Sequence, residues 1–173
     1  MQAGKGSRRA AQLYKDGGFA QFAVMMKLLD IPPVWLCLAM TLAWLQAKFL
    51  HLGLLASPVM MVVGWALLAM GLVLTLAAAW AFWRHKTTIM PNQTPKHIIQ
   101  SGVFSITRNP IYLGDALILA GLCLAWGAFP ALVLVPAFIW WITVHFIVGE
   151  EARMRAAFGD AYSDYEDKVR RWV

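Results

Sequence analysis

The chain has 173 residues, 60% of them hydrophobic, and a formal net charge of +6. A soluble domain of this length has too small a core to bury so many apolar side chains, so part of the apolar surface must face lipid. The positive charge could attract nucleic acid, but the basic residues flank apolar segments and do not gather on one soluble face. The composition therefore predicts an integral membrane protein whose partner is the lipid bilayer, with no nucleic acid.

The N-terminal part, residues 1–31, is predicted to be a basic cytosolic lead that ends in a short helix. Apolar residues from Phe19 to Leu29 recur at spacings of three and four, which places them on one helical face. This helix, over residues 19–31, can lie in the membrane interface, and a simple extension towards the first span is an equal alternative. Pro32-Pro33 interrupts it, so residues 32–173 are expected to form a single membrane domain.

Four apolar segments follow, and they predict an all-α, polytopic membrane helical bundle. The expected spans are residues 34–50, 59–83, 111–126 and 131–148. The third is short for a bilayer, which predicts a tilted helix or one whose start is sunk in the protein. After the fourth, apolar and aromatic residues recur at helical spacing, which predicts a C-terminal cytosolic amphipathic helix that Gly159 can divide in two.

The distribution of basic residues predicts which ends of the spans share a membrane face. Every lysine and arginine except Lys48 lies before the first span, between the second and the third, or after the fourth. The positive-inside rule therefore places the N-terminus, the central loop and the tail in the cytoplasm. Arg108-Asn109-Pro110 and Glu150-Glu151 then lie on the same cytosolic face, one at the start of the third span and the other at the end of the fourth, where they can meet.

Two adjacent glutamates directly after an apolar span are a candidate functional site, because charge at a membrane boundary is costly unless it is paired or faces water. Glu150 and Glu151 could equally be solvated carboxylates at the start of a helix, with Glu151 pairing to Arg155 one turn later. The pattern alone leaves these two interpretations evenly balanced.

Residues 102–173 resemble the isoprenylcysteine carboxyl methyltransferase and phospholipid methyltransferase superfamily. The resemblance is carried by Gly102-Val103-Phe104, Thr107-Arg108-Asn109-Pro110-Ile111-Tyr112-Leu113-Gly114, Glu150-Glu151, Phe158-Gly159-Asp160-Ala161-Tyr162-Ser163-Asp164-Tyr165 and Val169-Arg170-Arg171-Trp172. It implies a multi-span helical bundle that binds S-adenosylmethionine at the cytosolic membrane edge without a soluble Rossmann domain. The family pattern has Arg-His-Pro where this chain has Arg108-Asn109-Pro110, and asparagine cannot carry a proton at neutral pH, so this position is expected to bind and not to transfer a proton.

The resemblance also implies roles for individual residues. The expected cofactor-binding residues are Gly102, Arg108, Asn109, Pro110, Tyr112, Gly114, Glu150, Glu151 and Tyr162, and the expected catalytic residues are Arg108, Glu150 and Arg170. A glutamate suits the cofactor's ammonium or ribose hydroxyls, Arg108 its carboxylate, and a tyrosine or Trp172 a ring or methyl-sulfonium contact. Methyl transfer from such a donor requires positioning and desolvation and no covalent nucleophile. Arg170 or Arg171 could hold the anionic head of a lipophilic acceptor.

The remaining polar and small residues are weaker candidates. His85 and His97 lack the spacing and the cysteines of a metal site, so no metal is expected. His145 is interpreted as a core histidine or one that faces the cofactor, and Asp115 as a buried carboxylate that can pair with Arg108. Small residues are expected to allow close helix packing, and these are Gly71, Thr75 and Ala79 in the second span and Gly114 and Gly121 in the third.

Two other functions compete with methyl transfer. Tyr112-Leu113-Gly114-Asp115 is also similar to the C-terminal part of membrane sterol reductases that use NADPH, although those are longer and have more spans. A non-catalytic membrane scaffold is the third possibility. The acceptor of a methyltransferase stays open among a prenylcysteine carboxylate, a phospholipid amine and a small thiol or xenobiotic.

Overall fold

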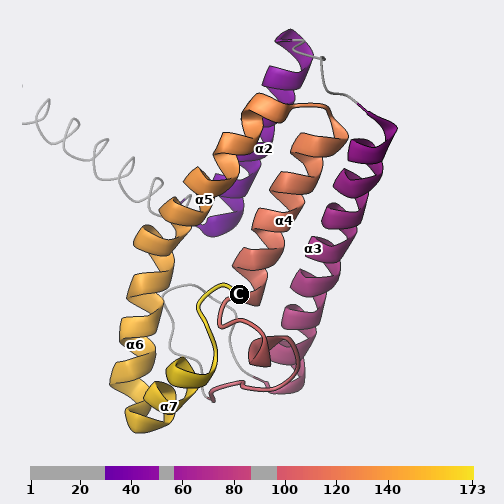
Figure 1. Ribbon diagram of the computed structural model, residues 1–173. Helices are drawn as coiled ribbons and strands as arrows, with labels where there is room; N and C mark the ends of the chain where they lie inside the picture. The colour runs from indigo at the N-terminus through magenta and orange to yellow at the C-terminus, as the bar shows by residue number, and fades with distance from the viewer. Residues whose placement is uncertain (1–29, 51–56, 87–96) are drawn as a thin grey trace, which may run out of the picture. The chain divides into compact units, whose positions relative to one another are not determined.

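The computed structural model describes residues 30–50, 57–86 and 97–173, and every regular element in these ranges is a helix (Figure 1). The elements are α2 (Pro32–Phe49), α3 (Pro58–Arg84), η1 (Gly102–Ser105), α4 (Pro110–Ala125), η2 (Phe129–Val133), α5 (Leu134–Ile142), η3 (Thr143–Ile147), α6 (Val148–Phe158) and α7 (Asp160–Lys168). The all-α prediction is confirmed. The interfacial helix predicted over residues 19–31 lies outside the described residues, apart from its last two positions.

The chain divides into two compact units, Met1–Trp35 and Leu36–Val173. In the described part of the first, the indole N–H of Trp35 donates to a carboxylate oxygen of Asp30 at 3.0 Å. The second unit holds every residue of the candidate site. There Gln46, near the end of α2, accepts a hydrogen bond from the backbone N–H of Ala131 in η2 at 3.3 Å.

Two helical stretches of the described chain are long and apolar enough to cross a membrane. They are α3, with 27 residues, and the continuous helical run Phe129–Phe158, with 30 residues. Helix α4 is apolar but has only 16 residues, as the sequence predicted, and α2 has 18. Two of the four predicted spans therefore have the length and composition of a span, and the assignment of α2 and α4 as spans stays a prediction.

The fourth predicted span, residues 131–148, has no break at its end. The chain passes from α5 through one π turn, η3, directly into α6, so Glu150 and Glu151 lie inside a helix and not after one. A π turn holds one residue more than an α turn and changes the direction in which the following side chains point. The break comes instead at Gly159, whose φ of 53° favours glycine and which separates α6 from α7.

Helices α3 and α4 run side by side and touch through glycines (Figure 1). A Cβ atom placed on Gly71 would lie 2.6 Å from the carbonyl oxygen of Gly114, and one on Gly64 would lie 2.7 Å from that of Gly121. Because the residue number rises along α3 as it falls along α4, the two helices are antiparallel. Small residues let their backbones approach closely, which confirms the predicted role of Gly114 and Gly121 in helix contact.

The buried small residues of α3 recur at a longer spacing than the four residues of the predicted stripe Gly71, Thr75 and Ala79. The buried residues are Gly64, Gly71 and Ala78, each seven positions after the last. Two of the three residues of the predicted stripe, Gly71 and Thr75, do face α4, since a Cβ atom on Gly114 would meet the hydroxyl oxygen of Thr75 and would lie 2.8 Å from the carbonyl oxygen of Gly71. Seven residues are close to two helical turns, so positions at this interval stay on the seam between two nearly aligned helices. A four-residue stripe drifts around the helix, and Ala79 accordingly lies partly exposed.

The C-terminal end of α3 supports the segment that leads to α4. Ala78 forms a buried cluster with Ile99 and Phe104, and the ring of Phe82 meets that of Phe104 edge-on at 5.3 Å. The hydroxyl of Tyr165 in α7 donates to the backbone carbonyl of Phe104 at 2.6 Å. η1 is thereby fixed to α3 on one side and to α7 on the other.

We expect Gly71→Ala to lower the stability of the folded protein by about 1–3 kcal/mol, because its Cβ would meet backbone that no side-chain rotation can move. Gly149→Ala is the matched control, since the nearest atom to its Cβ is the flexible end of Arg153 at 3.4 Å. Thermal unfolding in detergent measures both changes. Equal unfolding temperatures for the two variants would contradict the glycine seam.

Candidate functional site

The segment before α4 is built to hold the C-terminal tail. Pro110 occupies the first turn of α4, where its missing N–H costs nothing. Asn109 precedes it at the capping position, where asparagine often caps a helix, but its side chain makes no capping hydrogen bond. The carboxamide instead donates through Nδ2 to the backbone carbonyl of Arg171 at 3.0 Å.

Three successive residues, Thr107 to Asn109, bond to two successive tail carbonyls. The buried hydroxyl of Thr107 donates to the carbonyl of Arg171 at 3.0 Å and accepts the backbone N–H of Asn109 at 3.2 Å. The backbone N–H of Arg108 donates to the carbonyl of Arg170 at 3.0 Å. These bonds fix the tail in one register along the segment that leads into α4.

Glu151 is the centre of the charged cluster, and its side chain is only 3% exposed. The guanidinium of Arg171 forks onto it, with Nε 2.9 Å from Oε1 and Nη2 2.6 Å from Oε2. Arg108 lies 3.3 Å away and Arg155, one turn later on α6, lies 3.5 Å away. The predicted Glu151–Arg155 pair is confirmed but is the longest of these contacts. Glu151 is therefore a buried, shared ion-pair partner and not a solvated surface carboxylate.

Glu166 of α7 closes the cluster, and no pattern in the sequence indicates this role. It accepts a hydrogen bond from Nη1 of Arg108 and two from Arg155, at 2.7 Å from Nε and 2.9 Å from Nη2. Burial alone would raise the pKa of this carboxyl, but the hydrogen bonds from Arg155 and Arg108 outweigh it and lower the pKa.

Glu150 has a different environment from its neighbour. Adjacent residues of a helix point about 100° apart, so Glu150 faces α4 while Glu151 faces the arginines. The hydroxyl of Tyr112, in the first turn of α4, donates to Oε1 of Glu150 at 2.8 Å. The structure therefore joins the start of α4 to α6 twice, through Tyr112 to Glu150 and through Arg108 to Glu151. The predicted meeting of these two segments is confirmed.

Tyrosines of α7 form the apolar side of the cluster. Tyr162 and Tyr165 are buried with Val169, and their rings lie 6.0 Å apart. Met154 and Phe158 of α6 pack against them. Burial, helped by the negative charge of Glu151, raises the pKa of Tyr162 to about 12, so its hydroxyl stays protonated at neutral pH.

The other predicted residues lie away from the charged cluster or meet it through the backbone. Gly102 has a φ of 62° and open space where a Cβ would be, so it serves the backbone turn. Gly114 faces Thr75 of α3. Arg170 contributes its carbonyl, and its side chain is exposed. Asp115 is buried in α4, but in the described chain the carboxylates that pair with Arg108 are Glu151 and Glu166, so the suggested Asp115–Arg108 pair is not formed.

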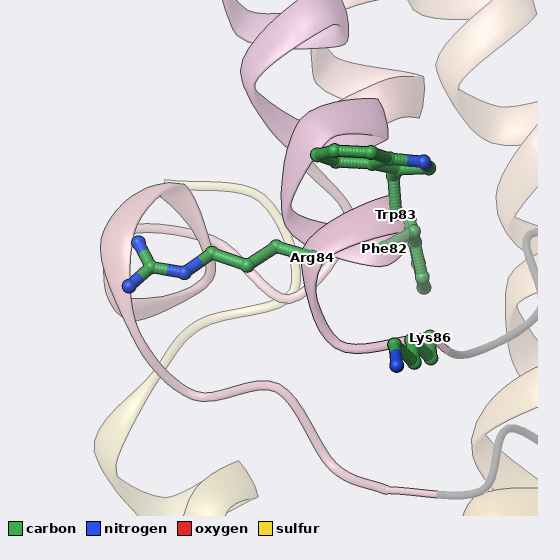
Figure 2. A pocket seen from close by; sticks show the side chains of 4 residues that line it. All are labelled: Phe82, Trp83, Arg84 and Lys86. Carbon is green, nitrogen blue, oxygen red and sulfur yellow. The ribbon is translucent and has the colours of Figure 1, made fainter.

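Two further features stand outside this cluster. A cavity at the C-terminal end of α3 is lined by Phe82, Trp83, Arg84 and Lys86, and Arg84 extends away from the side on which Trp83 and Lys86 lie (Figure 2). His145 is exposed and stacks on Trp141, with ring centres 4.9 Å apart, so it is no core histidine. Within the described ranges, no three His, Cys, Asp or Glu side chains are grouped to hold a metal ion.

Comparison with known families identifies the class of protein that this arrangement belongs to. A family model described as phospholipid methyltransferase matches residues 59–161, more than half of the chain, and the chain belongs to that family. The matched region runs from α3 into α7 and includes Arg108, Tyr112, Glu150 and Glu151. No match was found among curated proteins or among solved structures. Family membership and the two span-length helices indicate a membrane methyltransferase, and the comparisons give no support to the reductase alternative.

We expect Glu166→Gln to lower the unfolding temperature, because a neutral amide loses the charge-assisted hydrogen bonds to Arg108 and Arg155. A loss of 1 kcal/mol corresponds to about 2–4 °C for a chain of this size. Since the pKa of Glu166 is lowered in the folded state, its contribution is present above the ordinary pKa of a carboxyl and is lost as the pH falls through the folded-state pKa.

The control is Asp167→Asn, which removes an exposed carboxylate from the same helix. Unfolding temperatures compared at neutral pH and at the acid end of this range give the test. If the two variants unfold alike at neutral pH, the bridging role of Glu166 is wrong.

Proposed function

We propose that this protein is an S-adenosylmethionine-dependent methyltransferase that acts on a lipophilic or lipid-attached acceptor at the cytosolic face of a membrane. The observation that carries the proposal is the polar cluster that joins the start of α4 to α6, α7 and the tail, in a chain that belongs to a methyltransferase family. S-adenosylmethionine supplies an electrophilic methyl group together with an ammonium and a carboxylate that the protein must recognise.

The donors and acceptors of the cluster fit such a zwitterion. Arg108 is 11% exposed, and its Nε is buried without a hydrogen-bond partner among the described residues. This guanidinium therefore keeps one unused donor, and a cofactor carboxylate would reach it by displacing the atoms that cover it. Glu150 is partly exposed, and Tyr112 occupies only its Oε1. We assign Arg108 to the cofactor's carboxylate and Glu150 to its ammonium, and we propose that the ring of Tyr162, which is buried in α7, makes an apolar or cationic contact.

Glu151 contributes to binding through the residues that it holds. Both of its oxygens are bonded by Arg171, and Arg108 and Arg155 lie within ion-pair distance. A ligand ammonium would have to displace one of these arginines to reach it. We therefore propose that Glu151 and Glu166 position Arg108, whereas Glu150 meets the cofactor directly.

The chemistry asked of the protein is modest. The acceptor atom supplies a lone pair to the methyl carbon, and the sulfonium leaves as a thioether, so no residue needs to form a covalent bond. The side chains bind and orient the reactants and exclude water between them. An amine of a phospholipid and a carboxylate of a prenylated cysteine both meet these requirements. The exposed guanidinium of Arg170 is proposed to hold the anionic head of the acceptor, since that of Arg171 is bonded to Glu151.

We expect Glu150→Gln to raise the Kd for S-adenosylmethionine about 10- to 100-fold, because a hydrogen bond to a charged group contributes about 1.5–3 kcal/mol. Titration calorimetry with the purified protein measures the change, and Asp164→Asn, an exposed carboxylate of α7, is the control. Saturable binding of NADPH with no binding of S-adenosylmethionine would contradict the proposed activity, and binding of neither would favour a non-catalytic scaffold.

We expect Arg170→Ala to raise the KM for an anionic lipid acceptor several-fold with little change in kcat, since the lost contact binds the ground state and the transition state alike. Lys168→Ala removes a nearby exposed cation and serves as the control. Methyl transfer to phospholipid vesicles and to a prenylcysteine analogue is assayed in parallel. An unchanged KM for both acceptors would remove Arg170 from the site.

A further inference from the structure

Asn109 links the segment before α4 to the C-terminal tail. Its Nδ2 donates to the carbonyl of Arg171, and the hydroxyl of Thr107 donates to the same oxygen, both at 3.0 Å. A carbonyl oxygen has two lone pairs, so these two donors saturate it. The backbone of Arg171 is therefore held from the segment before α4, while its side chain is held by Glu151 on α6.

The chemistry of the carboxamide limits what Asn109 can do in this place. An amide neither gains nor loses a proton near neutral pH, and one of the two N–H groups of its Nδ2 donates to the tail carbonyl. It lies next to Arg108, whose guanidinium is shared by Glu151 and Glu166. Asn109 is thus suited to fix the place of the tail, and through it Arg171 and Glu151, without touching the reacting atoms.

We propose that Asn109 is a positioning residue whose carboxamide clamps the C-terminal tail, so that the Arg171 fork keeps Glu151 in place beside Arg108. Any side chain of similar reach that donates an N–H can replace it. The kinetic consequence rests on the proposed methyltransferase function, but the clamping of the tail does not.

Three substitutions separate clamping from proton transfer. Asn109→Ala removes the donor, Asn109→Asp keeps the size but presents an acceptor to the carbonyl, and Asn109→His restores an N–H in both its neutral and its protonated forms. Gln100→Ala is the matched control, because it deletes an exposed carboxamide in the segment that precedes η1.

Hydrogen exchange of the tail, followed by mass spectrometry over residues 165–173, is the first readout. Loss of one neutral hydrogen bond should speed exchange about three- to tenfold in Asn109→Ala and Asn109→Asp, and Asn109→His and Gln100→Ala should match the unmodified protein. If Asn109→Ala fails to fold, the isosteric Asn109→Asp decides. Unchanged tail exchange in the folded donor-less variants would overturn the proposal.

Steady-state methyl transfer is the second readout. Asn109→Ala should raise the KM for S-adenosylmethionine more than it lowers kcat, and Asn109→His should recover the KM with a pH profile of kcat that shows no new step in the titration range of histidine. A new step there, or a loss confined to kcat, would show that the position moves a proton and would overturn the proposal. If the unmodified protein transfers no methyl group, the proposed function fails while the exchange experiment still decides the clamp.

Discussion

A carboxylate taken out of water must be compensated by nearby cations, and Glu151, whose side chain is 3% exposed, is the group on which this site depends. Its compensation comes from three places in the sequence: Arg155 on its own helix, Arg108 before α4 and Arg171 in the tail. If one of these three arginines is removed, the buried carboxylate of Glu151 has fewer cations to compensate its charge. Burial of one side chain therefore links segments that are far apart in the chain, and Glu166 extends the link to α7.

The glycine seam places the start of α4, and with it the segment that carries Arg108, against the second half of α3. Gly71 meets Gly114 near the start of α4, whereas α3 continues from Gly71 to Arg84. Towards the last turns of α3, Ile111 in the first turn of α4 and Phe104 of η1 both belong to the apolar cluster around Ala78. The segment before α4 is thereby held against α3 through η1, while α7 and the tail bond to it.

The sequence could predict those features that depend on local periodicity and on the distribution of basic residues along the chain. Apolar runs predicted the helices. The positive-inside rule predicted that Arg108 and Glu151 lie at the same end of the bundle, and their ion pair confirms that they meet. The role of Glu166 could not be read in this way, because an ion pair across 58 positions leaves no local pattern. The tail bonds were equally hidden, since they use backbone carbonyls that every residue has. The seven-residue spacing of the buried residues in α3 could not be told from a four-residue spacing without the position of the neighbouring helix α4.

The π turn between α5 and α6 sets the helical phase of everything that follows it. One inserted residue rotates the downstream helix by about 100° about its axis relative to the upstream one. Glu150 and Glu151 follow the end of the π turn, Ile147, by three and four residues, which is about one helical turn. This single insertion therefore decides which of the two adjacent carboxylates meets the tyrosine of α4 and which meets the arginines. In a chain with an uninterrupted α-helix here, Glu150 and Glu151 would be rotated about the helix axis by a quarter turn or more. Glu150 would then no longer face Tyr112, and Glu151 would no longer face the arginines.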